Sequence, residues 1–253
     1  MGKLKTNRIG EQVINKYGRK LTIIEYKDYD HIVIEVDDVC KTKIRTRYKI
    51  FSNGCYIASP YDKTIHNTGY IGIGEYNITN NRCAYNKWSD MIYRCYDPYF
   101  LNNNKTYIDC TVCDEWLNFQ NFAKWYEENY YECNNGKMCL DKDILVKGNK
   151  IYSPDTCVFV PHEINMLFVK ADKIRGDLPI GVVFDKDRDL YTAKISIKNK
   201  IKFLGRYNTR EEAFLVYKQF KENYIKQVAE EYVKLIPNKL YKAMCEWKVE
   251  MYD

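Results

Sequence analysis

Alternation of polar and apolar residues dominates the first quarter of the chain and predicts strands. The strand expected over residues 42–51 is unusual, because basic residues recur at every second position from Lys41, just before it, to Lys49. A strand directs alternate side chains to opposite faces, so the pattern places five positive charges on one face. Such a row suits contact with a nucleic-acid backbone, while the alternative is an edge strand guarded against aggregation. The five residues are Lys41, Lys43, Arg45, Arg47 and Lys49.

The middle of the chain begins with helical spacing. Apolar residues recur every three or four positions in residues 85–96, and aromatic residues do so in 115–130, which is typical of helices that bury one face. After Gly136 the pattern changes to a strand over residues 139–146, a polar turn over 147–150, a second strand over 152–161 and then a helix. This order predicts a ββα unit whose polar residues gather where the elements meet.

Three further strands and a long helix are expected near the C-terminus. The strands cover residues 180–184, 190–197 and 200–204. Thr209 and Glu212 form the pattern of a capping box, so the helix begins after Thr209. Apolar residues then recur at intervals of three or four, which predicts a helix packed on the sheet.

Composition excludes two classes of protein. The 253 residues carry 40 Lys and Arg against 34 Asp and Glu, a net charge of +6. Apolar runs stay well below the roughly 18 residues of a membrane span, and the first residues lack the apolar core of a signal peptide. We therefore expect an intracellular protein without a membrane partner, its ten cysteines mostly reduced.

The charge is unevenly distributed along the chain. Residues 1–68 hold 13 basic and 8 acidic side chains, residues 69–171 hold 10 and 13, and residues 172–253 hold 17 and 13. Two basic ends, +5 and +4, thus flank an acidic middle of −3. Basic segments suit a polyanion and an acidic one suits a metal-dependent centre, the alternative being solvated charge without a ligand.

The stretch LDKDILVKGNKIYSPDTCVFVPHEINMLF, residues 140–168, resembles the HNH nucleases, and more narrowly the phage-encoded HNH proteins related to homing endonucleases. The resemblance extends over about residues 69–171. In that family a metal ion lies on a ββα hairpin, a His ending the first strand activates water, and a loop Asn orients that His. The resemblance implies Mg²⁺, or Mn²⁺, bound by oxygen atoms of Asp141, Asp143 and Asn165.

Lys142 stands where the family has its catalytic His. A lysine with its ordinary pKa of about 10.4 is a poor general base at neutral pH. Active cleavage with a relocated base and a degenerate, inactive hairpin therefore both stay open. The candidates for catalytic roles are His162 as the base, Asp143, and Asn149 or Asp155 at the loop position.

Four cysteines have part of the spacing of a zinc site. Cys110 and Cys113 form a CxxC pair, which is half of the structural site found in many HNH modules. Cys133 and Cys139 are the candidates for the other half, but five residues separate them instead of two to four. Buried free thiols are the favoured interpretation, and structural Zn²⁺ is the alternative.

Four motifs stand in order in residues 178–225: Gly181-Val182, Tyr191-x-Ala-x-Ile195, Leu204-Gly205-x-Tyr207 and Thr209-x-Glu-Glu-Ala213. They resemble the DNA-binding domain of plant APETALA2-type transcription factors, which also occurs C-terminally in bacterial and phage HNH homing endonucleases. In that family the exposed face of a three-stranded sheet lies in the major groove; a module retained for protein contacts is the alternative. The resemblance implies contact with double-stranded DNA by Lys186, Arg188, Lys194, Ser196, Lys202 and Phe203.

Together the patterns predict an α+β protein of three modules. These are a small SH3-like β-barrel in residues 1–68, an HNH-like ββα module with extra helices in 69–171, and a three-stranded sheet plus helix with a helical tail in 172–253. The expected function is that of a phage or mobile-element DNA-binding protein that nicks or cuts DNA with a divalent metal. The alternative is a degenerate factor that binds DNA or a host protein without nuclease activity. Either would act in the cytoplasm, that of the host cell if phage-encoded.

Overall fold

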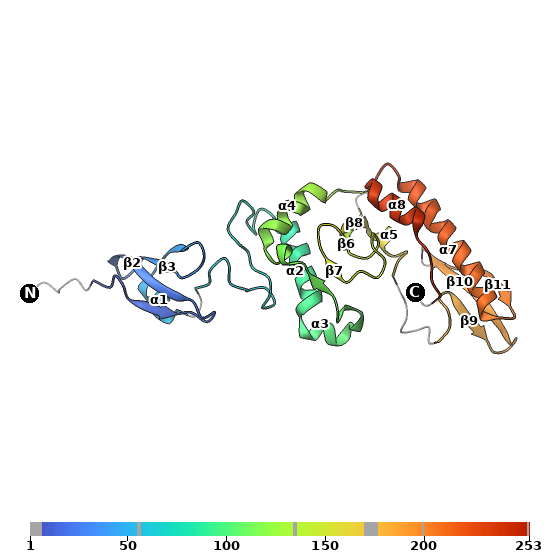
Figure 1. Ribbon diagram of the computed structural model, residues 1–253, viewed down its shortest axis with the longest axis horizontal. Coiled ribbons are helices and arrows are strands. Elements are labelled where there is room, and N and C mark those ends of the chain that lie inside the picture. Colours follow the sequence, from blue (N-terminus) through green and yellow to red (C-terminus); the bar gives the residue numbers. More distant parts are fainter. Residues whose placement is uncertain (1–6, 55–56, 134–135, 170–176, 199, 252) are drawn as a thin grey trace, which may run out of the picture. The chain divides into compact units, whose positions relative to one another are not determined.

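The computed structural model describes residues 7–54, 57–133, 136–169, 177–198, 200–251 and 253. The chain contains both helices and strands, in groups that follow one another along the sequence (Figure 1). It divides into two compact units, Met1–Glu128 and Asn129–Asp253. This division falls inside the segment 69–171, and the expected boundary between residues 171 and 172 lies outside the described residues. None of the described helices is long and apolar enough to cross a membrane.

The first unit begins with a four-stranded antiparallel sheet in which sequential strands are neighbours. A short helix follows the last strand, and its Phe51 is fully buried in the same core as Leu21 and Ile34 of the sheet. The elements are β1 (Gln12–Ile14), β2 (Lys20–Asp28), β3 (His31–Val36), β4 (Lys43–Thr46) and α1 (Tyr48–Asn53).

This sheet corrects two expectations. Within the described residues it stays open, with β1 and β4 at its edges, so the expected SH3-like barrel is not closed. Both edge strands are short, and the chain leaves β4 at Thr46 to enter α1. The strand expected over residues 42–51 therefore ends early, and Lys49 lies on a helix.

The rest of the first unit is mainly helical. Its core is aromatic: Trp88, Trp116, Phe119 and Phe122 are fully buried, as their helical spacing predicts. The Trp88 indole donates a hydrogen bond of 2.7 Å to the carbonyl oxygen of Trp116. The elements are α2 (Arg82–Tyr96), α3 (Pro98–Asn103), β5 (Thr111–Val112) and α4 (Phe119–Asn129), with 3₁₀ turns at Lys105–Tyr107 and Asp114–Leu117.

The second unit begins with a hairpin and a short helix. Strands β6 and β8 pair antiparallel, from Met138 opposite Pro161 to Asp141 opposite Val158. Strands and a helix follow in the predicted order, but the first strand ends at Asp141 instead of Val146, the short strand β7 precedes β8, and the helix is only four residues long. The elements are β6 (Met138–Asp141), β7 (Ile151–Tyr152), β8 (Val158–Pro161) and α5 (His162–Asn165).

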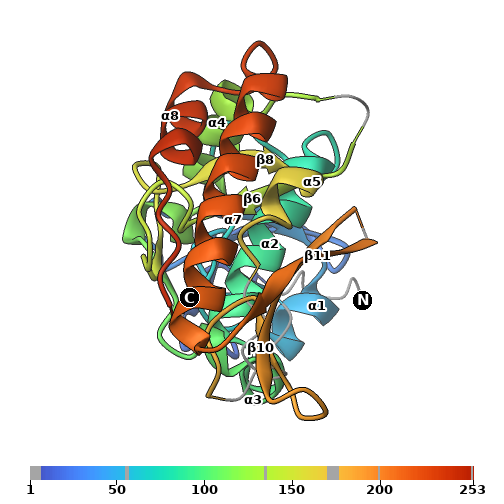
Figure 2. The ribbon, with the colours of Figure 1, turned by 90° about the vertical axis from the view of Figure 1, so that its right-hand side faces the viewer.

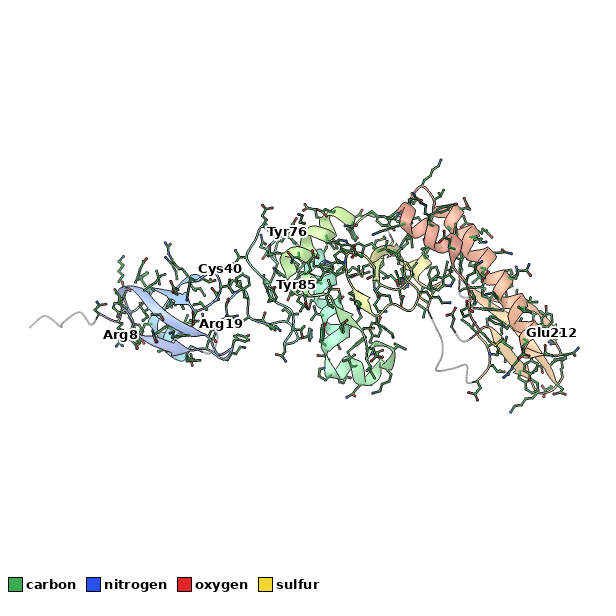
Figure 3. All side chains as sticks on the ribbon, in the orientation of Figure 1. Arg8, Arg19, Cys40, Tyr76, Tyr85 and Glu212 are labelled. Atoms are coloured by element: carbon green, nitrogen blue, oxygen red, sulfur yellow. The ribbon has the colours of Figure 1, made fainter. Side chains whose placement is uncertain are left out.

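A three-stranded antiparallel sheet follows, with β10 in the middle. The capping box is confirmed, because the Thr209 hydroxyl accepts from the Glu212 amide and the Glu212 carboxylate accepts from the Thr209 amide. Figure 3 labels Glu212 at this end of the helix that follows. Helix α7 runs along one face of this sheet (Figures 1 and 2). The elements are β9 (Val182–Asp185), β10 (Leu190–Ile197), β11 (Lys200–Tyr207), α7 (Arg210–Tyr232) and α8 (Asn238–Glu246).

Helix α7 belongs to two hydrophobic cores. Its first half packs Ala213 and Tyr217 against Ala193 of the sheet. Its second half packs Ile225 in a core that also contains Val160 of the hairpin and residues of α8. One continuous helix thus holds the hairpin and the sheet in the same unit.

Lys221 lies on the buried side of α7, four residues after Tyr217 and four before Ile225. No ion pair or hydrogen bond joins it to another described residue, and burial lowers its pKa from 10.5 to about 8. The unfolded chain therefore binds this proton at pH values where the folded chain has lost it. By linkage, Lys221 destabilises the fold below pH 8, and this penalty disappears as the pH rises toward 10.5.

We expect Lys221→Met to raise the free energy of unfolding at pH 7 by about 2 kcal/mol, because a neutral side chain carries no desolvation penalty there. The difference from wild type should shrink at pH 9.5, as wild type gains stability. Urea unfolding at both pH values measures this, with the exposed Lys226→Met as the matched control. A difference that is independent of pH would contradict the prediction.

Candidate nucleic-acid interface

The outer face of the three-stranded sheet carries the candidate DNA-binding residues that the structure brings together. Ala193 and Ile195 of β10 turn inward to the core with α7, so Lys194 and Ser196 turn outward. Across the strand pair, Lys194 lies opposite Phe203. Phe203 is 53% exposed.

Lys202 differs from its neighbour Phe203. Adjacent residues of a strand point to opposite faces, and Lys202 lies opposite the inward-facing Ile195. Its Nζ is 4.6 Å from the ring centroid of Phe220 on α7. The structure therefore places Lys202 on the helix side of the sheet, away from the other candidates.

Arginine side chains extend the outer face. Arg206 lies opposite Thr192, and its guanidinium carbon is 5.0 Å from the Phe203 ring centroid. Its Nε also lies 3.5 Å from a carboxylate oxygen of Asp185, and Arg188 in the β9–β10 turn lies 3.1 Å from the same oxygen. Desolvation acts to raise the pKa of Asp185, but the hydrogen bond from Arg188 and both positive charges hold it below its ordinary value. Two arginines thus share one carboxylate, and the three side chains together keep a net positive charge.

Three outer-face residues were not among the candidates: Arg206, Ile201 and Val183. Ile201 is 73% exposed opposite Ser196, and Val183 lies opposite Thr192. The signal that could have identified them is the cross-strand register, which places each beside a β10 residue already assigned to the outer face. Lys186 is exposed in the β9–β10 turn, at the end of the face.

The five basic residues of the first unit do not form one row. Lys43 and Arg45 alone lie on β4, with Glu35 of β3 directly opposite Lys43. Lys41 is in a turn with a φ of 50° and bonds Asp37 at 2.6 Å. Arg47 lies 3.8 Å from Asp30. All five side chains are exposed, but acidic neighbours offset much of their charge.

Three of the candidate metal and catalytic residues, Asp141, Asp143 and Asn149, lie at the end of β6 and in the loop that follows it. One carboxylate oxygen of Asp141 accepts hydrogen bonds from the backbone amides of Asp143 and Ile144, at 2.9 and 2.8 Å. Burial, together with the charge of Asp143, raises the pKa of Asp141 to about 6. The Asn149 amide group donates to the carbonyl oxygens of Lys142 and Ile151, both at 2.7 Å, and so closes the loop.

The side chain of Lys142 enters this loop. Its Nζ donates to a carboxylate oxygen of Asp143 and to the carbonyl oxygen of Asn149, both at 3.0 Å. These two oxygen atoms, of Asp143 and Asn149, are thus already hydrogen-bonded to the positively charged ammonium group of Lys142. These residues do not fit the Mg²⁺ or Mn²⁺ that the HNH resemblance implies, because the Lys142 ammonium group is bonded to the Asp143 carboxylate that would bind the metal.

The other candidates lie elsewhere on the hairpin. His162 follows Pro161, which is three ladder positions from Asp141, or about 10 Å along the strands. Its backbone amide donates to the carbonyl oxygen of Lys137, and its Nδ1 lies 3.6 Å from the Cys139 sulfur. His162 is therefore not brought to the Asp141 loop.

Asn165 and Asp155 are not brought into hydrogen-bond contact with Asp141 either. Asn165 is the half-buried last residue of α5, and its carbonyl oxygen accepts from the Phe168 amide. Asp155 is exposed in the turn before β8.

The four candidate zinc cysteines are divided between the two units. Cys110 and Cys133 are buried, and Cys113 and Cys139 are half-buried. Burial raises the pKa of the Cys113 and Cys133 thiols, which favours the protonated form over the thiolate that binds zinc. Among the residues described, no group of three or more His, Cys, Asp or Glu side chains could hold a metal ion.

Comparison with known proteins gives no match. No protein-family model matches the chain, and no curated protein or solved structure matches it. The resemblances to HNH nucleases and to APETALA2-type domains therefore rest on the quoted residues alone.

Proposed function

We propose that the protein binds double-stranded DNA through the outer face of the β9–β11 sheet and does so without cleaving it. The observation that carries the proposal is the group formed by Lys194, Phe203 and Arg206, in which an exposed ring lies beside two cationic side chains. Aromatic and apolar residues are costly to expose on a protein surface, so a contiguous exposed group is typical of a binding site.

The dimensions of this sheet suit the DNA major groove. Neighbouring strands are about 4.8 Å apart, so three strands span roughly 10 Å of backbone, and the groove is about 12 Å wide. In this arrangement Lys194 and Arg206 would contact phosphates or guanine edges. Phe203 and Ile201 would contact thymine methyl groups.

The hairpin supports the second part of the proposal, that the protein does not cleave DNA. Cleavage of the HNH kind needs a base near the bound metal, but Lys142 replaces the expected His, and His162 is at the other end of the β6–β8 ladder. Helix α7 packs on the hairpin and on the DNA-binding sheet. We therefore assign the hairpin a supporting role for the helix that carries the sheet.

Charge reversal on the two faces of the sheet tests the proposal. Lys194→Glu is expected to weaken binding of a labelled duplex of mixed sequence about tenfold to a hundredfold and to reduce the salt dependence of binding. Lys202→Glu makes the same change of charge on the helix side and should change the affinity less than about threefold. Fluorescence anisotropy over a salt titration, with and without Mg²⁺, measures both.

The two parts of the proposal have different contradictory outcomes. Equal effects of Lys194→Glu and Lys202→Glu, or no duplex binding by wild type at low salt, would remove the outer face as a DNA site; binding to a host protein would then be the alternative. Nicking of supercoiled DNA by wild type in Mg²⁺, abolished in Asp141→Ala, would instead restore the nuclease expectation.

A further inference from the structure

The loop between β6 and β7 is built around a buried ammonium group. Lys142 is only 8% exposed. Besides the Asp143 carboxylate and the Asn149 carbonyl oxygen, its Nζ faces the ring of Tyr152, with 5.9 Å to the centroid. A carboxylate, a backbone carbonyl and an aromatic face are all groups that stabilise a cation.

The backbone of the loop is organised around the same residue. The carbonyl oxygen of Lys142 accepts from the Asn149 amide group, while the Lys142 ammonium donates to the Asn149 carbonyl oxygen. The two residues therefore bond each other in both directions across the loop. Asp141 fixes the first turn of the loop, and Ile144 enters the core shared with α7.

Placing a long cationic side chain inside a loop has a cost. Burying an ammonium group is unfavourable unless oxygen atoms replace its water. Lys142 meets this condition with a charged partner and a backbone partner at hydrogen-bond distance. An ammonium group at this position also repels any divalent cation that would approach the Asp143 carboxylate.

We propose that Lys142 is a built-in cation, which takes the place of a divalent metal and closes the β6–β7 loop of this hairpin. The loop then holds its shape without a metal ion, and the fold does not depend on metal supply. This inference concerns the stability of the hairpin, so it can fail or succeed independently of DNA binding.

Thermal unfolding of the full chain tests the inference. Wild type is expected to show the same melting temperature in EDTA, in Mg²⁺ and in Mn²⁺. Lys142→Met should lower the melting temperature by about 5 °C, because Asp143 and Asn149 lose their shared donor. Lys137→Met, the same change at an exposed position just before β6, should leave it within about 1 °C.

A second measurement titrates Mn²⁺ into the protein and reads metal binding directly instead of unfolding. Electron paramagnetic resonance of added Mn²⁺ should show the free ion at all protein concentrations. Saturable Mn²⁺ binding that Asp143→Asn abolishes would overturn the inference. Melting of Lys142→Met at the temperature of Lys137→Met would overturn it as well.

Discussion

Replacing Gly181 with alanine is expected to lower the free energy of unfolding by about 3 kcal/mol, the largest loss we expect from adding a single methyl group. Gly181 has a φ of 76°, a left-handed conformation that costs other residues energy. A Cβ atom at this position would lie 2.0 Å from Cδ2 of Tyr217. The ring cannot easily move, because Tyr217 is 5% exposed in the core between sheet and helix.

The loss should extend to DNA binding. The Gly181 carbonyl oxygen accepts the backbone amide of Lys194 at 2.9 Å, so a shift at Gly181 moves the residue at the centre of the proposed interface. Urea unfolding measures the stability, and anisotropy with a labelled duplex measures the affinity.

Two controls separate the causes of this loss. Gly148 also has a left-handed φ, of 80°, but nothing lies within 4 Å of a Cβ built there. Gly148→Ala should therefore cost only the backbone penalty, about 1 kcal/mol. In a Tyr217→Ala background the clash is absent. Adding Gly181→Ala there should therefore lower the free energy of unfolding by about as much as Gly148→Ala does in wild type. Equal losses for Gly181→Ala and Gly148→Ala would contradict the role of Tyr217.

Much of the sheet in the second unit could be predicted because its signals are local. Alternation in β10 separates Ala193 and Ile195 from Lys194 and Ser196, and the structure follows it. The capping box marks the first turn of α7 through residues only three positions apart. Signals of this kind do not depend on the rest of the fold.

The sequence-based predictions were wrong where long-range contacts determine the orientation or the end of a strand. In β11 the apolar Ile201 and Phe203 lie on the exposed face, and the cationic Lys202 lies on the helix side. Hydrophobicity alone therefore gives the wrong orientation, which the pairing with β10 determines. In the first unit, exposure alternates from Lys41 to Tyr48 although the strand ends at Thr46, so the pattern conceals the start of α1.

The proposed interface and the hairpin depend on the same helix, which the sequence could not indicate. The apolar stripe of α7 predicts that the helix packs on something. Only the structure divides that stripe into a half that contacts the sheet, through Tyr217, and a half that contacts the hairpin core, through Ile225. A lysine, Lys221, lies between the two halves at a cost that burial imposes. Because Lys221 lowers stability at this position, the sequence of α7 fits a helix that joins the sheet to the hairpin better than one that maximises stability.

Loss of the Trp88 side chain is expected to be the most damaging change in the first unit. Trp88 is fully buried, and its ring is so close to Gly69 that a Cβ there would lie 2.8 Å from it. Trp88→Ala should lower the free energy of unfolding by about 4 kcal/mol, since it creates a cavity and leaves the Trp116 carbonyl oxygen without its donor. Urea unfolding followed by circular dichroism measures this.

Replacement of each tryptophan by phenylalanine separates the hydrogen bond from the packing. Trp88 and Trp116 are both fully buried, but within the described residues the Trp116 Nε1 has no partner, whereas the Trp88 Nε1 donates to the Trp116 carbonyl oxygen. Trp88→Phe loses a satisfied donor and Trp116→Phe loses an unsatisfied one. We therefore expect Trp88→Phe to cost about 2 kcal/mol more than Trp116→Phe. An equal cost would mean that ring volume alone sets the stability of this core.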